Sequence, residues 1–150
     1  MATNTCTASC PPDAVFDVLA DGWLYPSWVV GASRIRDVET SWPAADAKIH
    51  HSFGIWPALI DDSTSVLEWE PPRRMVLKAR GWPMGAAKVE LDVEPTPAGC
   101  RITIREDAIE GPGTLMPKPV RDAMIHVRNV ETLRRLCYLA EGRAGAASTS

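Results

Sequence analysis

Residues 119–142 read PVRDAMIHVRNVETLRRLCYLAEG and form the longest helical pattern in the chain. At about 100° per residue, apolar side chains recur along one face of this segment, as in a helix that packs on a core. That face carries Val130, Leu133, Leu136, Cys137 and Ala140, and the opposite face carries Arg128, Glu131, Arg134, Arg135 and Tyr138. The pattern predicts one long amphipathic helix near the end of the chain.

Three polar side chains interrupt the apolar face of this helix. Asp122, His126 and Asn129 fall on the side that we expect to be buried. A buried polar group must either find a hydrogen-bond partner or face an enclosed, partly wet space. We therefore expect a cavity beside the helix.

The segment before the helix has the pattern of an antiparallel sheet. Between residues 33 and 107 there are six stretches of strand character, separated by short turn-rich pieces at residues 43–46, 61–63, 71–72 and 95–99. Short links of this kind join antiparallel neighbours. The alternation is clearest at residues 88–94, where every second side chain is apolar. A seventh strand is predicted at residues 3–10.

The strand predicted at residues 101–107 places one acidic group inside. Ile102 and Ile104 share its apolar face, and the same alternation turns Glu106 inward. Glu106 lies near the end of the sheet, where the chain leaves for the long helix. We therefore expect Glu106 close to the polar groups of that helix.

Together these elements predict an α+β fold in a single domain. After the first strand, Pro11-Pro12-Asp13 is typical of a helix start, and the helix is expected to end at Ala20 or Asp21. A second short helical or turn segment is predicted at residues 24–29. About seven antiparallel strands would then form a curved sheet wrapped around the C-terminal helix. We assign the domain to residues 1–142 and predict a disordered tail at residues 143–150.

The amino-acid composition excludes some classes of function. The 150 residues are 45% hydrophobic and 23% charged, and the net charge of -3 provides no basic surface for nucleic acid. No apolar run approaches the ~20 residues that span a bilayer, and the N-terminal residues lack the pattern of a signal peptide. We therefore expect a cytoplasmic protein that binds no nucleic acid and does not span a membrane.

The chain resembles a known family over nearly its whole length. Residues 10–21, CPPDAVFDVLAD, together with Tyr25-Pro26-Ser27-Trp28 and the C-terminal helix, are similar to the helix-grip fold of the START/Bet v 1-like superfamily, and specifically to its polyketide cyclase/dehydrase (SRPBCC) branch. Residues 105–112, REDAIEGP, and 128–136, RNVETLRRL, resemble an actinobacterial subgroup more closely. The resemblance implies a hydrophobic cavity for lipids, sterols, polyketides or aromatic metabolites. It carries no catalytic motif onto particular residues.

The candidate catalytic residues are His126, Asp122 and Glu106. Asp122 and His126 are one helical turn apart, so the carboxylate can fix the imidazole tautomer and raise its basicity. In a cyclase, aromatase or dehydratase, His126 would be the base, and Glu106 or Asn129 would position the substrate carbonyl. The alternative is that these groups bond to one another or cap loop amides in a structural role.

The candidate ligand-binding residues are mostly aromatic. If Ile49 and Phe53 face the interior, His51 does too, either as a satisfied core residue or as a ligand contact. Tryptophans can stack on a flat ligand or simply clamp strand ends. The full candidate set comprises Asn129, His51, Phe53, Trp28, Trp69, Trp82 and Leu133.

The four cysteines and three histidines do not indicate a metal centre. Cys6, Cys10, Cys100 and Cys137 lack the paired spacing of a zinc site, and we interpret them as small buried hydrophobes. Cys6 and Cys10 would share a face of one extended segment, too far apart to bridge each other. No dinucleotide or phosphate-binding fingerprint is present, so no cofactor is expected.

The leading hypothesis is therefore a protein that encloses a small hydrophobic or aromatic molecule between the sheet and the C-terminal helix. The second hypothesis is an enzyme of the polyketide cyclase type that uses acid-base residues in the same cavity. The third is a module whose groove binds another protein. The sequence leaves homodimer formation open.

Overall fold

The structure is a computed structural model, and it describes residues 2–29, 32–53, 60–81 and 85–149. Its main layer is a seven-stranded sheet in the order β1-β7-β6-β5-β4-β3-β2, and every neighbouring pair is antiparallel. The strands are β1 (Ala2–Ala8), β2 (Ala32–Val38), β3 (Lys48–Phe53), β4 (Ile60–Glu70), β5 (Arg74–Gly81), β6 (Gly85–Thr96) and β7 (Gly99–Glu110). The first strand of the chain thus lies beside the last.

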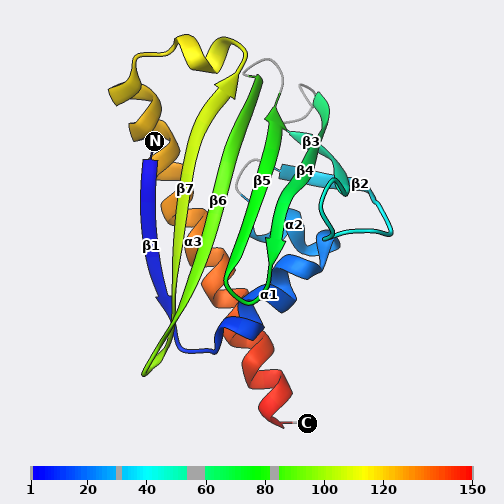
Figure 1. The fold of residues 1–150 in the computed structure, drawn as a ribbon, viewed down its shortest axis with the longest axis vertical. Helices are drawn as coiled ribbons and strands as arrows, with labels where there is room; N and C mark the ends of the chain where they lie inside the picture. The colour runs from blue at the N-terminus through cyan, green and yellow to red at the C-terminus, as the bar shows by residue number, and fades with distance from the viewer. Residues whose placement is uncertain (1, 30–31, 54–59, 82–84, 150) are drawn as a thin grey trace.

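The long C-terminal helix and the short helices after β1 lie on one side of this sheet, and a further 3-10 helix follows the end of β7 (Figure 1). They are α1 (Pro12–Ala20), the 3-10 helix η1 (Gly22–Leu24), α2 (Tyr25–Trp28), the 3-10 helix η2 (Pro112–Leu115) and α3 (Lys118–Thr149). Helix α3 runs obliquely behind the sheet and packs against β1, β7, α1 and α2. This curved sheet with one long helix and two short helices after β1 is the predicted helix-grip fold.

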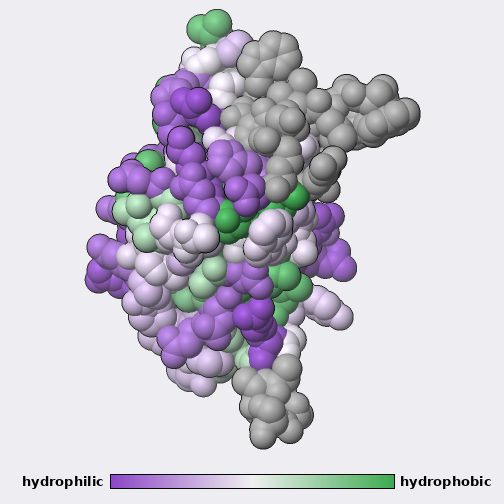
Figure 2. Space-filling view, turned by 90° about the vertical axis from the view of Figure 1, so that its right-hand side faces the viewer, coloured by the Kyte–Doolittle hydropathy of each residue, from purple (hydrophilic) through white to green (hydrophobic). Residues whose placement is uncertain are grey.

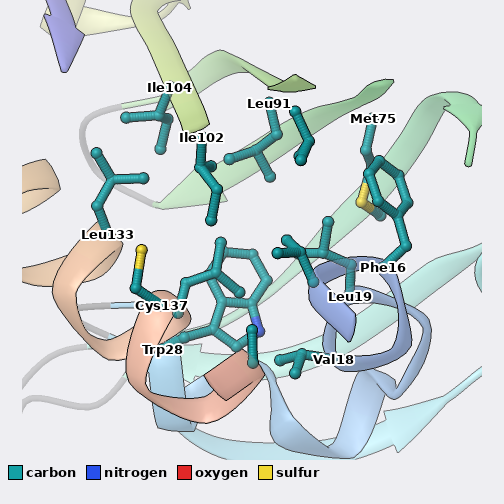
Figure 3. Packing of buried hydrophobic residues seen from close by; sticks show 14 of the residues in the cluster. Phe16, Val18, Leu19, Trp28, Met75, Leu91, Ile102, Ile104, Leu133 and Cys137 are labelled. Atoms are coloured by element: carbon teal, nitrogen blue, oxygen red, sulfur yellow. The ribbon is translucent and has the colours of Figure 1, made fainter. Parts of the chain in front are cut away.

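The hydrophobic core fills the space between the sheet and the helices. Strand alternation supplies its sheet side, because Leu91, Ile102 and Ile104 are all fully buried. In Figure 3, Leu133 and Cys137 project from α3 toward Ile102 and Ile104 of β7. Burying one side chain of this size contributes about 1.5–3 kcal/mol to stability. The core therefore fixes α3 against the strands that carry Glu106 and the other interior polar groups.

Helix α3 differs from the prediction in two respects. It begins at Lys118 and continues to Thr149, beyond the expected end at residue 142. Arg143 lies 3.5 Å from the carboxylate of Asp21, and Ala144 packs against the core. Val130 was predicted to be buried but is 51% exposed. The buried face of α3 is therefore narrower than the helical pattern suggested.

The surface on the β2 side of the molecule mixes hydrophilic and hydrophobic residues (Figure 2). On this face a hydrophobic area lies near the middle, below the residues drawn in grey. None of the helices in the described ranges combines the length and apolar character needed to cross a membrane.

A buried polar cluster as candidate functional site

Five polar side chains from five elements meet inside the apolar core. They are Tyr25 of α2, His51 of β3, Thr64 of β4, Glu106 of β7 and Arg128 of α3, and we call them the interior polar cluster. His51, Thr64 and Tyr25 are almost completely buried, and so is Glu106. Burying polar groups is favourable only when they bond to one another or to a ligand, so their contacts define what the site can do.

A hydroxyl group links two rings in this cluster. Thr64 Oγ1 lies 2.9 Å from Tyr25 Oη and 2.8 Å from His51 Nε2. The rings of Tyr25 and His51 are stacked, with centroids 5.6 Å apart and planes 14° apart. Because each hydroxyl has a single proton, Thr64 can donate to only one neighbour and accept from the other. The three groups can therefore exchange protons along a line from the imidazole to the phenol.

The other half of the cluster is an ion pair. Arg128 reaches from α3 to the carboxylate of Glu106, whose side chain is 5% exposed, whereas that of Arg128 is 38% exposed. Burial lowers the pKa of Arg128 because the charged guanidinium loses part of its hydration. Burial also raises the pKa of Tyr25, against the smaller opposing effects of the Thr64 hydrogen bond and the Arg128 charge. Arg128 thus connects the ion pair electrostatically to the Tyr25 hydroxyl.

Two more buried donors belong to Trp28 and to Asn129, the residue that follows Arg128 on α3. Trp28 packs edge-on against Tyr25, with ring centroids 5.3 Å apart. Trp28 Nε1 and Asn129 Nδ2 are both buried, and neither has a hydrogen-bond partner among the described residues. Leaving such a donor unpaired costs about 1–3 kcal/mol. An acceptor on a bound molecule would remove that cost.

The predicted acid-base pair lies elsewhere. His126 is exposed, and Asn4 Nδ2 donates to its Nδ1 over 2.7 Å. Asp122 is half-buried and pairs with Lys118 Nζ at 2.7 Å, one turn earlier on the helix. The expectation that His126 faces the core was therefore wrong, because the first half of α3 turns this face toward β1 and solvent. The catalytic roles of His126 and Asp122 stay predictions.

Four of the candidate ligand-binding residues lie in the interior of the protein. His51, Asn129 and Leu133 are buried, as expected, and Trp28 is buried as well. Trp69 is half-buried and packs against Phe16 of α1, with ring centroids 5.3 Å apart. Phe53 belongs to β3, but its side chain lies outside the described part of the structure.

Trp82, the last of the candidate ligand-binding residues, lies outside the described residues altogether.

Sequence reasoning missed three members of the cluster. Arg128 was assigned to the solvent face of the helix, but its long side chain reaches inward to Glu106. Thr64 follows residues that we predicted to form a turn, and Tyr25 was noted only within Tyr25-Pro26-Ser27-Trp28. The available signal was the aromatic pair three residues apart, which can place two rings on one helical face.

The described residues contain no group of three or more His, Cys, Asp or Glu side chains arranged to hold a metal ion. The interior polar cluster itself offers an arginine, a carboxylate, a phenol, a hydroxyl and an imidazole. Such a set can bind an acidic or carbonyl group and can transfer protons.

Solved structures share this fold at low sequence identity. A protein from Nitrosomonas europaea is 17% identical, with a TM-score of 0.71 over 93% of each chain. The di-domain ARO/CYC protein StfQ of the steffimycin biosynthetic pathway is 13% identical, with a TM-score of 0.71 over 99% of this chain and 51% of StfQ. Ara h 8.0201 is 11% identical, with a TM-score of 0.66 over 96% of each chain. At these identities the likeness concerns the fold alone.

The sequence itself identifies the family. No curated protein sequence matches the chain. The family described as polyketide cyclase / dehydrase and lipid transport matches residues 2–136, which include all seven strands, α1, α2 and the part of α3 that carries Arg128 and Asn129. This chain belongs to the polyketide cyclase / dehydrase and lipid transport family.

Proposed function

We propose that the protein binds a small hydrophobic or aromatic molecule, of lipid or polyketide type, in a cavity between the concave face of the sheet and α3. The observation that carries this proposal is the interior polar cluster, which sits within an otherwise apolar core. Sites for small molecules typically have apolar walls and a few placed polar groups that orient the ligand. The family to which the chain belongs supports the same class of ligand.

The polar groups favour a ligand with an acidic or strongly accepting end. Arg128 has five N–H donors, and its pairing with Glu106 leaves some of them for a second acceptor. Trp28 Nε1 and Asn129 Nδ2 add two neutral donors that lack partners in the described structure. A carboxylate, an enol or a phenol on a hydrophobic skeleton matches this set.

Native mass spectrometry of gently purified protein is the first test. We expect a reproducible mass excess that disappears on denaturation, and its value would separate lipid from aromatic cargo. A clean mass for the protein alone after purification from several hosts would argue against tight binding.

A charge-selective binding assay tests the ligand class. The anionic probe anilinonaphthalene sulfonate is compared with the neutral probe N-phenyl-1-naphthylamine. Loss of a hydrogen bond to a charged group costs about 1.5–3 kcal/mol, so Arg128→Met is expected to weaken the anionic probe about 10–100-fold and the neutral probe little. Arg134→Met is the matched control, because Arg134 lies on the same helix with its side chain 81% exposed. Equal loss for both probes would contradict a charge-selective site.

The hydroxyl link between Tyr25 and His51 favours a second candidate function, an acid-base enzyme of the cyclase or dehydratase type. Aldol-type cyclisation needs a base that forms an enolate and an acid that assists the loss of water. His51, Thr64 and Tyr25 could supply both through one line of hydrogen bonds. The predicted residues His126, Asp122 and Glu106 offer a second route to the same chemistry.

The two routes can be separated by variants assayed with a poly-β-ketone thioester. Thr64→Val removes the linking hydroxyl with little change of shape, and His126→Ala removes the surface imidazole. If the interior relay acts, Thr64→Val is expected to reduce turnover about 10²-fold or more while binding is retained. If only His126→Ala reduces turnover, the chemistry lies at the surface of α3. Full activity in both variants would exclude both routes, and a wild type without turnover would leave binding as the function.

Homodimer formation stays open, and a cytoplasmic location stays a prediction. Light scattering coupled to size-exclusion chromatography measures the first directly.

A further inference from the structure

The four cysteines gather at one end of the molecule, although they are spread over the chain. Cys6 lies in β1 and Cys100 in the neighbouring strand β7, where Cys100 is paired in register with Ala8. Cys10 follows β1, and Cys137 lies on α3. All four are free thiols, and they form two pairs, Cys6 with Cys137 and Cys10 with Cys100. Their spacing in the sequence gives no sign of this arrangement.

The Cys6–Cys137 pair is in contact. The Sγ atoms lie 2.7 Å apart, with Cys6 projecting from the edge strand β1 toward α3. At this separation a bond requires only a small side-chain adjustment, and the backbones of β1 and α3 are already packed together.

The pair is also reachable from solvent. Cys6 and Cys137 both line a groove of about 430 Å³ between β1 and α3, together with Asn4, Leu133, Tyr138 and Glu141. Cys6 is half-buried and Cys137 is buried. A small oxidant in the groove can therefore meet Cys6 first and leave Cys137 behind it as the second thiol.

We propose that Cys6 and Cys137 are a redox modification site, at which a peroxide forms a reversible disulfide that ties β1 to α3. The Cys6 thiolate attacks one peroxide oxygen, the O–O bond breaks, and Cys6 becomes a sulfenic acid while hydroxide leaves. Cys137 then gives up its proton, and its thiolate attacks the Cys6 sulfur. The S–O bond breaks, the S–S bond forms, and the hydroxyl departs with the Cys137 proton as water. Two electrons pass from the two thiols to the peroxide, and a thiol reductant reverses the change.

The burial of each thiol determines which cysteine reacts first with the peroxide. Burial raises the pKa of Cys137, and the adjacent Cys6 adds to this effect, so Cys137 is poorly suited to meet the oxidant itself. Burial also raises the pKa of Cys10 to about 12. Cys10 and Cys100 are 2% and 0% exposed. The second pair is therefore expected to stay reduced while the first is oxidised.

The experiment treats the full chain with a small excess of hydrogen peroxide. Remaining thiols are then alkylated with N-ethylmaleimide in denaturant, and the protein is digested with trypsin. Residues 1–34 form one tryptic peptide that contains both Cys6 and Cys10. The variant Cys10→Ser is therefore used beside the wild type, because it leaves Cys6 as the only thiol of that peptide. The partner peptides are then distinct, residues 136–143 for Cys137 and residues 89–101 for Cys100.

The expected result is a cross-link between the peptides 1–34 and 136–143 in both proteins. The oxidised wild type takes up two fewer alkyl groups than the reduced protein, and a phosphine reductant restores them. In Cys6→Ser the peroxide is expected to produce no cross-link to residues 136–143. The oxidised wild type is also expected to unfold at a higher temperature than the reduced protein, a difference that Cys6→Ser lacks.

Three results would overturn the proposal. One is a wild type whose four thiols all react with maleimide after peroxide treatment. Another is a cross-link that joins residues 1–34 to residues 89–101 and not to residues 136–143. The third is a Cys6 that proceeds to sulfinic acid while Cys137 stays a free thiol. The wild-type mapping decides each of these even if a variant fails to fold.

Discussion

Breaking the Arg128–Glu106 ion pair from its two sides is expected to have unequal effects on stability. The side chain of Glu106 is 5% exposed, whereas that of Arg128 is 38% exposed. Arg128→Met leaves a buried carboxylate without its counter-charge. Glu106→Gln leaves an arginine that can turn toward water and still donate to the glutamine oxygen. Because Glu106 is the more buried partner, Arg128→Met is expected to destabilise the protein more than Glu106→Gln does.

The magnitudes follow from the exposure of each partner. Removing one member of a fully buried ion pair costs about 3–5 kcal/mol. Solvent reaches the arginine end of this pair, which reduces the expected cost of Arg128→Met to about 2–3 kcal/mol. Glu106→Gln is expected to cost about 1 kcal/mol. The double variant has no unpaired charge, so its destabilisation should fall short of the sum by about 1–2 kcal/mol.

Urea denaturation of the wild type, both single variants and the double variant measures these free energies of unfolding. For a chain of this size, 2–3 kcal/mol corresponds to a fall in melting temperature of about 4–12 °C. Arg135→Met is the matched control, because Arg135 pairs with Glu131 on the same helix and both side chains are at least 40% exposed. That control is expected to cost less than about 1 kcal/mol.

Two outcomes would refute this reasoning. If Arg128→Met costs no more than Arg135→Met, the carboxylate of Glu106 is not isolated from water. If the two substitutions at the ion pair add without coupling, Arg128 and Glu106 do not interact in solution.

Three further predictions concern ionisation, packing and backbone geometry. The variant Tyr138→Phe leaves Tyr25 as the only tyrosine. Burial raises the pKa of Tyr25, so its ionisation, followed by ultraviolet absorbance, is expected above pH 10.0, and the protein should lose stability as pH rises from 10.0 through this raised pKa because the unfolded state loses the proton first. Ionisation at or below pH 10.0 would contradict the burial of Tyr25. Leu136→Ala is expected to lower the free energy of unfolding by about 2–5 kcal/mol, measured by urea denaturation, because Leu136 is fully buried. The control Val127→Ala is expected to lower it by about 0.5 kcal/mol or less, because Val127 is 72% exposed. Equal losses would contradict the packing of α3. Gly99→Ala is expected to destabilise the protein by about 1–3 kcal/mol, because Gly99 has φ +154° and a Cβ there would collide with a backbone oxygen of residue 8. An unchanged melting temperature would contradict this expected destabilisation.

The sheet was predictable where its pattern is local. Val89, Leu91 and Val93 alternate with polar residues, and all three are buried in β6. The same rule turned Glu106 inward, and its side chain is buried in β7. A period of two residues needs only the neighbouring sequence, so no knowledge of distant contacts was required.

Strand β4 shows where such reasoning fails. Asp61-Asp62-Ser63 was predicted to be a turn, yet β4 runs from Ile60 through these residues to Glu70 and pairs with β3. Farther along, a register shift between Val66 and Glu68 leaves Leu67 exposed, so alternation does not hold there. Pairing with neighbouring strands overrides polar composition, and a bulge resets the alternation without a sequence signal.

The candidate site was predicted only in part, because its members meet through long-range contacts. Tyr25 and Thr64 are joined by a hydrogen bond across 39 positions of the chain. The helical pattern assigned one buried face to all of residues 119–142, whereas α3 packs against four elements, and His126 contacts β1 while Arg128 reaches β7. This is why Asn129 was placed correctly and His126 was not. Arg128 was missed because a long side chain can start on an exposed face and end in the core.

Strand β1 is synthesised long before β7, the strand with which it pairs in the folded protein. In the sheet, Ala2 lies opposite Glu106, about a hundred residues later in the chain. At roughly 5–20 residues per second, the ribosome finishes β1 roughly 5–20 s before it has made β7. During this interval β1 has neither its neighbouring strand nor α3 to cover its inward side chains. Strand β1 thus waits for β7 before it can take its place in the sheet, and a nascent chain stalled before residue 99 would expose β1 to any chaperone or protease that recognises extended segments.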